Sequence, residues 1–318
     1  MKRRVAVPFA VAAAIVALCL SFAPAFALNL RSFISGAGDD NNSCTRLDPC
    51  TSFAAAMAHT FAHGEIDCLD TGEFYYFIIA KSITIDCHGV VGGLTSDVTT
   101  PNTAGIVINF DLFDPSDTPP VVVLKNISIN GAGDAYGGIF IAGAGSGSVV
   151  KIENCAINGS NLTGGSGIDD ERNHGFLSID NTKVSNNEAI GILIKSISNG
   201  SRRAVIKNTQ VFNSGTGISV GSYSEVVISH SDISDNATAG LVVSASTGSA
   251  AVDSTTIAHN GYAFQNSGTV RLSNSDVAYN ATAWTGTINT FTNNRFTNNG
   301  GVGPLVPIGT ASNPTGEQ

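Results

Sequence analysis

The chain has 318 residues, a formal net charge of −9 at pH 7 and only 13% charged residues. Nucleic-acid-binding proteins need clustered Lys and Arg against phosphates, so this composition argues against nucleic acid as a partner. The 35 glycines and the 7% aromatic content are typical of disordered chains, but a hydrophobic share of 42% supplies enough apolar material for a core.

The first 27 residues have the pattern of a secretory signal peptide. Residues 2–4 are basic, residues 5–20 are mostly apolar, and Ala25-Phe26-Ala27 is a small-x-small cleavage site. The apolar run is shorter than the roughly 20 residues that a membrane span needs. We therefore expect cleavage after Ala27 and a protein without a membrane span that is secreted, either to the exterior or to the periplasm.

Residues 28–64 are predicted to form an N-terminal cap with a helix at about residues 53–62. Ser52 is a suitable N-cap residue, and Phe53, Met57 and Phe61 recur at i, i+4 and i+8, which gives one apolar face. We expect this face to cover the first coil of the repeats that come after the cap. The preceding stretch GAGDDNNSC is rich in oxygen atoms but lacks the EF-hand spacing, so we favour a capped turn over a calcium loop.

From residue 65 to residue 300 the chain repeats one motif, apolar-x-Asn-x-x-apolar-x-x-Asn, often followed by Gly and a third apolar run. The first Asn of the motif is Asn126, Asn154, Asn181, Asn208, Asn274 and Asn293, with His230 and Ser254 at the equivalent place in two units. A period of about 20 to 30 residues is typical of solenoids. Short runs rich in Val and Ile predict strands, three in each unit, with no room for a helix. The expected fold is all-β, a parallel β-helix with three strands per coil and about ten coils.

The stacking of coils gives the Asn residues a predicted structural role. Equivalent residues of neighbouring coils lie about 4.8 Å apart, so each amide can donate to one neighbour and accept from the other. His230 and Ser254 are interpreted as substitute rungs of this Asn ladder. Opposite charges at the adjacent outward positions are expected to pair, and these positions are Lys125, Glu153, Asp180, Lys207, Ser229, Asp253, Ser273 and Thr292.

Five cysteines follow the predicted cleavage site. Cys44 and Cys50 suit a small closed loop, and Cys68 and Cys87 are expected to be stacked neighbours that are close enough for a disulfide without requiring one. For Cys155 we favour a buried free thiol over an intermolecular disulfide. No Cys-x-x-Cys or Cys/His spacing typical of metal sites occurs, and we expect neither a metal nor a cofactor.

These repeats, together with the stretch SGAGDDNNSCTRLDPCTSFAAAMAHTFAHGEIDC, resemble the secreted right-handed parallel β-helix repeat proteins of bacteria, which share the pectate-lyase-like superfold. The resemblance of the repeats covers roughly residues 65–300. It implies a right-handed coil, and it implies little about activity because most of those proteins have none assigned and the fold hosts many functions. Polysaccharide-cleaving members carry their catalytic groups outward, on strands and loops of neighbouring coils.

One segment, GIDDERNHG at residues 167–175, concentrates charge. Its candidate catalytic residues are Asp169, Asp170, Glu171, Arg172 and His174. Paired carboxylates are the groups of glycoside hydrolysis, and an Arg beside carboxylates suits a lyase. The segment resembles elements of the polygalacturonases, but in that family those elements lie on separate coils. A charged loop tip at the edge of a sheet is the alternative interpretation.

Our leading hypothesis from the sequence is an exported scaffold that binds a polysaccharide or a cell-surface glycan without catalysis. The alternative is a polysaccharide lyase or glycoside hydrolase that uses residues 167–175, and a third class is a structural spacer that binds no glycan.

Aromatic residues that could stack on sugars are few: residues 74–77, FYYF, and Trp284. Residues 301–318, rich in Gly and Pro, are predicted to form a C-terminal tail.

Overall fold

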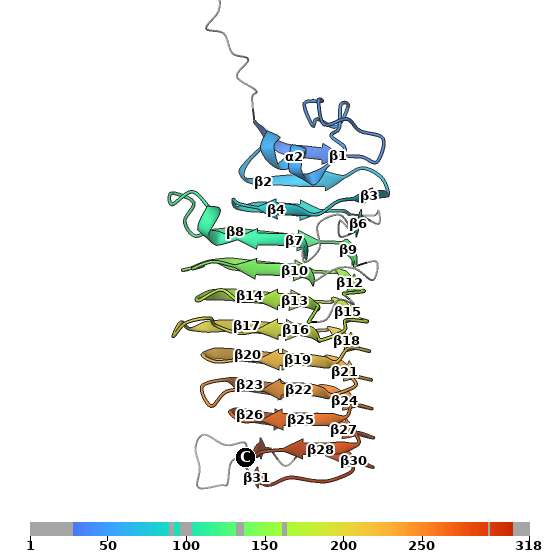
Figure 1. Cartoon of the computed structure of the whole chain (residues 1–318), viewed down its shortest axis with the longest axis vertical. Helices are drawn as coiled ribbons and strands as arrows, with labels where there is room; N and C mark the ends of the chain where they lie inside the picture. Colours follow the sequence, from blue (N-terminus) through green and yellow to red (C-terminus); the bar gives the residue numbers. More distant parts are fainter. Residues whose placement is uncertain are drawn as a thin grey trace, which may run out of the picture.

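The computed structural model describes residues 28–88, 92–95, 104–131, 137–160, 164–291 and 293–307. The predicted signal peptide and the last part of the predicted tail lie outside these ranges. The described chain winds into a tall column of stacked coils with three parallel sheets along its sides (Figure 1). No helix within these ranges is both long enough and apolar enough to cross a membrane.

Each coil passes through three sheets in turn, which we call sheets 1, 2 and 3. Sheet 1 has twelve strands, in stacking order β1 (Asn29–Ile34), β2 (Thr60–Cys68), β5 (Ile83–Asp86), β8 (Val121–Lys125), β11 (Val149–Glu153), β14 (Gly175–Asp180), β17 (Arg202–Lys207), β20 (Ser224–Ser229), β23 (Ser249–Asp253), β26 (Thr269–Ser273), β29 (Ile288–Thr290) and β31 (Leu305–Pro307). Sheet 2 has ten, β3 (Gly72–Phe74), β6 (Gly92–Thr95), β9 (Ile127–Asn130), β12 (Ala156–Asn158), β15 (Lys183–Ser185), β18 (Gln210–Phe212), β21 (Asp232–Ser234), β24 (Thr256–Ala258), β27 (Asp276–Ala278) and β30 (Arg295–Thr297). Sheet 3 has nine, β4 (Phe77–Ile79), β7 (Ala104–Asn109), β10 (Gly137–Ala142), β13 (Ser166–Asp170), β16 (Ile190–Ile194), β19 (Thr216–Val220), β22 (Ala239–Val243), β25 (Tyr262–Asn266) and β28 (Thr282–Thr285).

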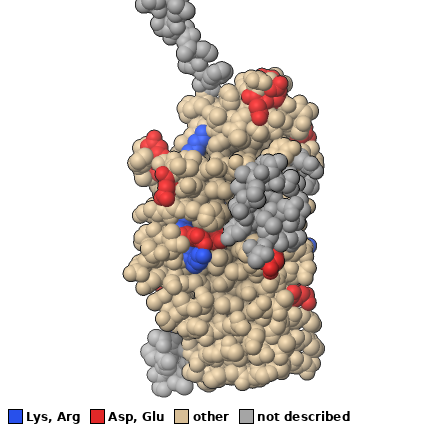
Figure 2. Space-filling view, in the orientation of Figure 1, with Lys and Arg blue, Asp and Glu red and all other residues tan. Residues whose placement is uncertain are grey.

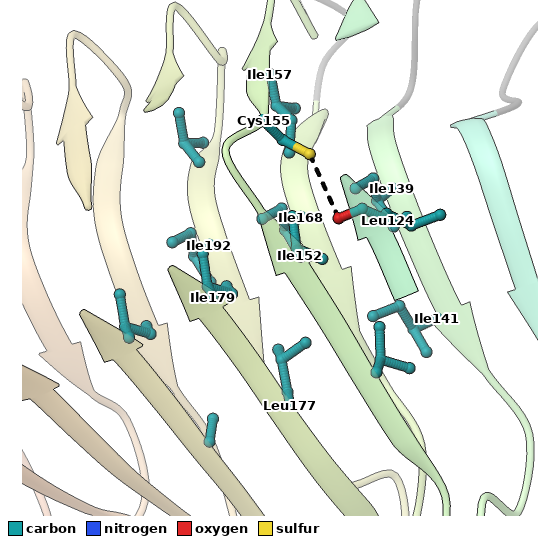
Figure 3. Close-up of a cluster of buried hydrophobic side chains, with 14 of the residues drawn as sticks. Leu124, Ile139, Ile141, Ile152, Cys155, Ile157, Ile168, Leu177, Ile179 and Ile192 are labelled. Carbon is teal, nitrogen blue, oxygen red and sulfur yellow. Dashed lines mark hydrogen bonds between the residues drawn. The ribbon is translucent and has the colours of Figure 1, made fainter. Parts of the chain in front are cut away.

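The strand count confirms the predicted architecture. The described strands make nine complete coils, from β2 to β28, followed by a partial one, and neighbouring strands pair in parallel with in-register partners. Inward side chains stack in columns through the core, one of which runs through Leu124, Ile152, Ile179 and Ile206 (Figure 3). Alternate residues are buried in most strands of sheet 1, which is why the apolar pattern of the sequence has a period of two there.

The first bend, between sheets 1 and 2, holds the Asn residues that the sequence predicts as a ladder. Five of them and both substitutes have left-handed backbone, with φ between 46° and 56°: Asn126, Asn154, Asn181, Asn208, Asn274, His230 and Ser254. The ladder forms only in part, because Asn181 donates to Asn154 (2.8 Å) and Asn293 to Asn274 (2.6 Å). Asn126, Asn208 and Asn274 donate instead to Asp86, Asp180 and Asp253. These amides are at least partly exposed, so the left-handed bend explains the choice of Asn better than a buried hydrogen bond does.

Two continuous polar ladders lie one residue further along the chain, where side chains face inward. At the first bend each hydroxyl accepts from the backbone N–H of the previous rung and donates to a carbonyl two residues back, and the rungs are Thr182, Thr209, Ser231, Thr255 and Ser275. At the second bend, between sheets 2 and 3, Asn236 donates through Nδ2 to Asn260 and Asn260 to Asn280, both at 3.0 Å. The buried amide ladder therefore uses the second Asn of the repeat, whereas the ladder predicted at the first Asn forms in part, between Asn154 and Asn181 and between Asn274 and Asn293.

The outward positions beside the first bend pair as expected where charges alternate. Lys125 forms an ion pair with Glu153 (3.6 Å), and Lys207 forms one with Asp180 (3.0 Å). Thr292, the last of the predicted outward positions, lies outside the described residues.

The N-terminal end of the column is covered by helix α2 (Phe53–His59). Ser52 caps it, since its hydroxyl accepts from the Ala55 N–H (3.1 Å), and Phe53 stacks on Phe77 with ring centroids 4.6 Å apart. The helix ends three residues earlier than we expected. Thr60 takes extended backbone and starts β2, which leaves Phe61 exposed instead of on the apolar face. A short 3-10 turn, η1 (Phe110–Leu112), is the second helical element of the described chain.

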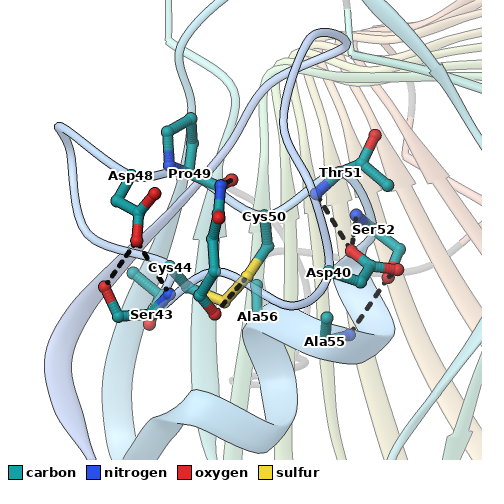
Figure 4. The surroundings of a disulfide bond; sticks show 12 residues. Asp40, Ser43, Cys44, Asp48, Pro49, Cys50, Thr51, Ser52, Ala55 and Ala56 are labelled. Carbon is teal, nitrogen blue, oxygen red and sulfur yellow. Dashed lines mark hydrogen bonds between the residues drawn. A yellow bond between two sulfur atoms is a disulfide. The ribbon is translucent and has the colours of Figure 1, made fainter.

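The cysteines pair as the sequence allows: Cys44 with Cys50 and Cys68 with Cys87. The acidic stretch before Cys44 forms a capped turn, in which the Asp40 carboxylate accepts from the N–H groups of Thr51 and Ser52 (Figure 4). Cys155 is free and buried, and its Sγ points toward the Leu124 carbonyl (Figure 3). Its thiol also lies 3.3 Å from the Glu153 carbonyl, two residues back, so it occupies the first rung of the hydroxyl ladder.

Candidate functional site

The segment GIDDERNHG spans the end of β13, the corner between sheets 3 and 1, and the start of β14. The structure places its five charged residues in three different environments. Asp170 and Arg172 are fully buried, Asp169 and Glu171 lie on the outer face of sheet 3, and His174 is exposed at the corner. The alternative of a charged loop tip in solvent is therefore wrong for Asp170 and Arg172.

Asp170 and Arg172 belong to a buried ion cluster with Arg202, the first residue of β17. Arg172 donates from Nε and Nη2 to the two oxygens of Asp170, at 2.9 and 2.7 Å. Arg202 forms an ion pair with the same carboxylate, and its Nη1 donates to the carbonyls of Asp170, Arg172 and Lys195. Burial lowers the pKa of Arg202, whereas the Asp170 carboxylate acts in the opposite direction. These three side chains bind one another and backbone carbonyls of the corner, an arrangement typical of a structural ion cluster.

The outer face of sheet 3 carries a second small group of charges. Glu171 forms an ion pair with Lys195 of the next coil (2.5 Å), and Asp169 lies in register between Phe140 and Leu193. Burial first, and the neighbouring Glu171 second, raise the pKa of Asp169 to about 7, although Lys195 opposes the shift. The buried Oδ1 atom of Asp169 has no hydrogen-bond partner in the described chain. A carboxyl with a pKa of about 7 beside a second carboxyl has the chemistry of a general acid or base.

Charge is otherwise sparse around this face. Figure 2 shows one mixed patch of acidic and basic side chains at mid-height, with largely uncharged surface below it. Within the described residues no group of three or more His, Cys, Asp or Glu side chains is placed to hold a metal ion.

A groove of about 610 Å³ opens at the corner where sheet 3 turns into sheet 1, and we call it the corner groove. It is lined by Ser146, Gly147, Ser148, Val149, His174, Gly175, Phe176, Ser201, Arg203 and Glu225. Val149, Phe176, Arg203 and Glu225 are successive partners on the outer face of sheet 1, so four coils contribute one side chain each. Only His174 belongs to the residues that the sequence singled out.

The buried ion cluster lies behind the lining of the corner groove and contacts it through Ser148. Arg172 Nη1 donates to Ser148 Oγ (2.6 Å), and Ser148 Oγ donates to the Gly145 carbonyl (2.6 Å). Gly175 has a φ of 123°, and a Cβ there would lie 2.6 Å from Ser148 Oγ and 2.7 Å from Arg172 Nη1. Only glycine fits at this position, because a side chain there would push the Arg172 guanidinium away from Ser148.

The polar groups of the corner groove are available to a ligand. Arg203 and Glu225 are partners in adjacent strands, yet no ion pair between them forms in the described chain. His174 Nδ1 accepts from the Ser201 N–H at 3.3 Å, which leaves Nε2 free to bind. A guanidinium, a carboxylate, an imidazole and the two exposed serines Ser146 and Ser201 provide donors and acceptors in the groove that Phe176 also lines, with its apolar ring.

The aromatic residues expected to stack on sugars are mostly used elsewhere. Phe74 and Phe77 pack against Phe53 of the capping helix, and Trp284 is buried. Tyr75 is the exposed member of the FYYF stretch. The sequence does not single out Phe176, Arg203 and Glu225, because outward residues follow no repeat. The signal that could have identified them is their shared register on adjacent coils.

Three parallel sheets around one core define a parallel β-helix. The model of the right-handed β-helix region family matches residues 137–313, more than half of the chain, and the chain therefore belongs to that family. This confirms the parallel β-helix that the repeats predict and the right-handed coil that the resemblance implies. No curated protein sequence matches the chain at a significant level.

Several solved structures are similar to the chain at low identity. Pectate lyase Pel9A is 14% identical, with a TM-score of 0.45 over 90% of this chain and 72% of the lyase. The lacto-N-biosidase of glycoside hydrolase family 136 from Eubacterium ramulus is 12% identical, with a TM-score of 0.47 over 87% of this chain and 68% of that enzyme. The A-module of the Azotobacter vinelandii mannuronan C-5 epimerase AlgE6 is 13% identical, with a TM-score of 0.44 over 79% and 88% of the two chains. At these values none of the three assigns an activity to this protein.

Proposed function

We propose that this protein is an exported β-helix that binds a carbohydrate in the corner groove without cleaving it. The observation that carries the proposal is the lining of that groove, in which Phe176 is the strand partner of Arg203 and shares the groove with Glu225 and His174. One cation and one anion at pH 7 balance each other there, so hydrogen bonds and contact with the ring, rather than net charge, would select the ligand.

The charged side chains of residues 167–175 lie in separate environments, which supports binding over cleavage. Cleavage of a glycosidic bond by an acid and a base needs two carboxyl groups that face the same bond. Asp170 is enclosed by two arginines, and His174 lies around the corner from Asp169 and Glu171. Export is part of the same proposal, because two disulfides are typical of proteins in oxidising compartments.

A glycan array, with a depolymerisation screen on the same polysaccharides, tests this proposal. Phe176→Ala and Arg203→Ala are each expected to weaken binding of the best glycan about tenfold, which corresponds to about 1.4 kcal/mol. Arg271→Ala is the matched control, since Arg271 is also an exposed arginine on the outer face of sheet 1 but lies outside the groove. Binding to no glycan, or unchanged binding by both groove variants, would refute the proposal.

A second candidate, cleavage of a polysaccharide at the outer face of sheet 3, is favoured by one observation. Asp169 has a pKa of about 7 and lies two residues from Glu171 on the same face, so the pair offers a proton donor and a carboxylate near neutral pH. If the depolymerisation screen detects products, Asp169→Asn and Glu171→Gln should each abolish them. Asp170 is unsuitable for this test because its removal would leave two buried arginines without a counter-ion.

A further inference from the structure

The second bend carries an irregularity that the fold does not require. Six of its residues have left-handed backbone, with φ between 51° and 57°: Asn186, Asn213, Asp235, His259, Tyr279 and Asn298. Asn, Asp and His tolerate this conformation, whereas the bulky ring of a tyrosine at positive φ is unfavourable. Tyr279 therefore breaks the local rule, and His259 occupies the equivalent position in the adjacent coil.

The two rings form one exposed unit. Their centroids lie 5.3 Å apart with an angle of 9° between the planes, and Tyr279 is 53% exposed. The buried amides of Asn260 and Asn280 follow directly in the chain and fix the backbone beneath the rings. Residues that the surrounding structure holds in an unfavourable backbone conformation are often found at binding sites. Where stability is the only requirement, a residue type that suits the backbone would replace them.

A second groove of about 440 Å³, which we call the bend groove, lies beside these rings. Asp235, His259 and Tyr279 occupy equivalent places in three successive coils, and the small residues Ala237, Gly261 and Ala281 occupy the places two residues further on. The side-chain polar atoms of Asp235, His259 and Tyr279 form no hydrogen bond or ion pair within the described chain.

We propose that the bend groove is a second ligand site, for an extended and uncharged oligosaccharide. A carboxylate, an imidazole and a phenol repeat at the coil spacing of about 4.8 Å, which presents hydrogen-bonding groups in a row to successive hydroxyls of such a chain. The floor of small side chains leaves room for the rings of the ligand. Asp235 is the one formal charge among the lining residues, so the groove repels polyanionic sugars. The bend groove shares no lining residue with the corner groove, and this proposal does not depend on the proposed function.

Calorimetric titration of the full chain with hexasaccharides tests the inference. The probes are cellohexaose and chitohexaose, which are uncharged, and hexagalacturonate, which is anionic. We expect at least one uncharged probe to bind and hexagalacturonate not to bind. His259→Asn and Tyr279→Asn should each weaken that binding about tenfold or more. Because Asn fits the left-handed backbone, neither variant should melt below the wild type.

Two controls separate binding in the bend groove from binding elsewhere on the column. Tyr223→Asn replaces another exposed left-handed tyrosine, with a φ of 52°, that lies outside the bend groove, and it should leave binding unchanged. Phe176→Ala should also leave it unchanged, so failure of the corner groove is distinguishable from failure here. The inference is overturned if neither uncharged probe binds, if the Asn variants bind as the wild type does, or if hexagalacturonate binds best. A lowered melting temperature with unchanged binding would likewise overturn it, because the rings would then be structural.

Discussion

Arg202 shows how a single buried side chain can close a corner of the column. Its guanidinium joins the Asp170 carboxylate to carbonyls of two different coils, those of Arg172 and Lys195. At this corner the chain leaves sheet 3 without a regular bend, so carbonyls that no strand partner can satisfy are bound by an arginine. The adjacent Arg203 points outward into the corner groove, which gives two neighbouring arginines opposite roles.

These roles predict very different effects on stability. Arg202→Ala should lower the free energy of unfolding by about 3–5 kcal/mol, because it leaves a buried carboxylate with one partner fewer and several carbonyls without a donor. Arg203→Ala should change it by less than about 0.5 kcal/mol, as exposed substitutions usually do. Chemical denaturation of both variants measures the difference. Equal losses would show that the buried cluster does not hold the corner together.

Asp169 makes stability depend on pH in a predictable direction. Its pKa is about 7 in the folded protein and 3.8 as a free side chain, so between these pH values the folded state holds the proton more often than the unfolded state. Its favourable contribution is complete below about pH 4 and is lost as the pH rises through 7. Asp169→Asn should therefore be more stable than the wild type by about 1–2 kcal/mol at pH 8, with the difference shrinking toward pH 4. Melting curves over this range check the prediction, and a difference independent of pH would contradict it.

At the scale of the structural elements, the bends rather than the strands decide which residue types the repeat allows. Each bend has one left-handed residue that faces outward and one following residue that faces inward onto a ladder. The first needs tolerance of positive φ, and the second needs to satisfy backbone N–H groups inside the column. The first demand favours Asn and the second selects Asn, Ser or Thr, so Asn occurs at both kinds of position and they look alike in the sequence.

The two kinds of position separate in a mutational comparison. Asn260 Nδ2 donates to Asn280 and to two backbone carbonyls, and its Oδ1 accepts from Asn236. Asn260→Ala should lower the free energy of unfolding by about 2–4 kcal/mol, because it leaves several buried groups unpaired. Asn181→Gly at the exposed first bend should cost less than about 1 kcal/mol, since Gly adopts the same backbone. Thermal unfolding of both variants provides the measurement, and a larger loss for Asn181→Gly would contradict the assignment of the ladders.

The same distinction explains what can be predicted from the sequence at this scale. The strands follow from the alternation of apolar residues, which reports burial directly. The repeat alone favours Asn154 and its equivalents as the ladder, because a repeat pattern shows which positions are constrained, not whether their side chains point inward. The sequence does not predict the end of the capping helix at His59 for a similar reason. Phe61 continues the apolar spacing of the helix but lies in a strand.

For the whole molecule, the period of the sequence is enough to predict the column, because every coil repeats the same inward pattern. The sites cannot be predicted in the same way. The corner groove needs outward residues from four coils, and coils of unequal length hide which of them are partners. Phe176, Arg203 and Glu225 are 27 and 22 residues apart, and only the register of β14, β17 and β20 shows that they are adjacent. Charge concentration at residues 167–175 points to the corner where the groove opens, but His174 is the one candidate residue of that segment that lines it.

The two ladders also set the steps in which this molecule can change its length. Each rung bonds only to the coil before it and the coil after it, so a coil does not depend on where it stands in the stack. Gain or loss of one complete coil would lengthen or shorten the column by about 4.8 Å and leave both sets of rungs aligned. Loss of half a coil would misalign both ladders at once. The length of the column can therefore change only in whole coils. Such a change alters the distance between outward surfaces and leaves the packing of the interior as it is.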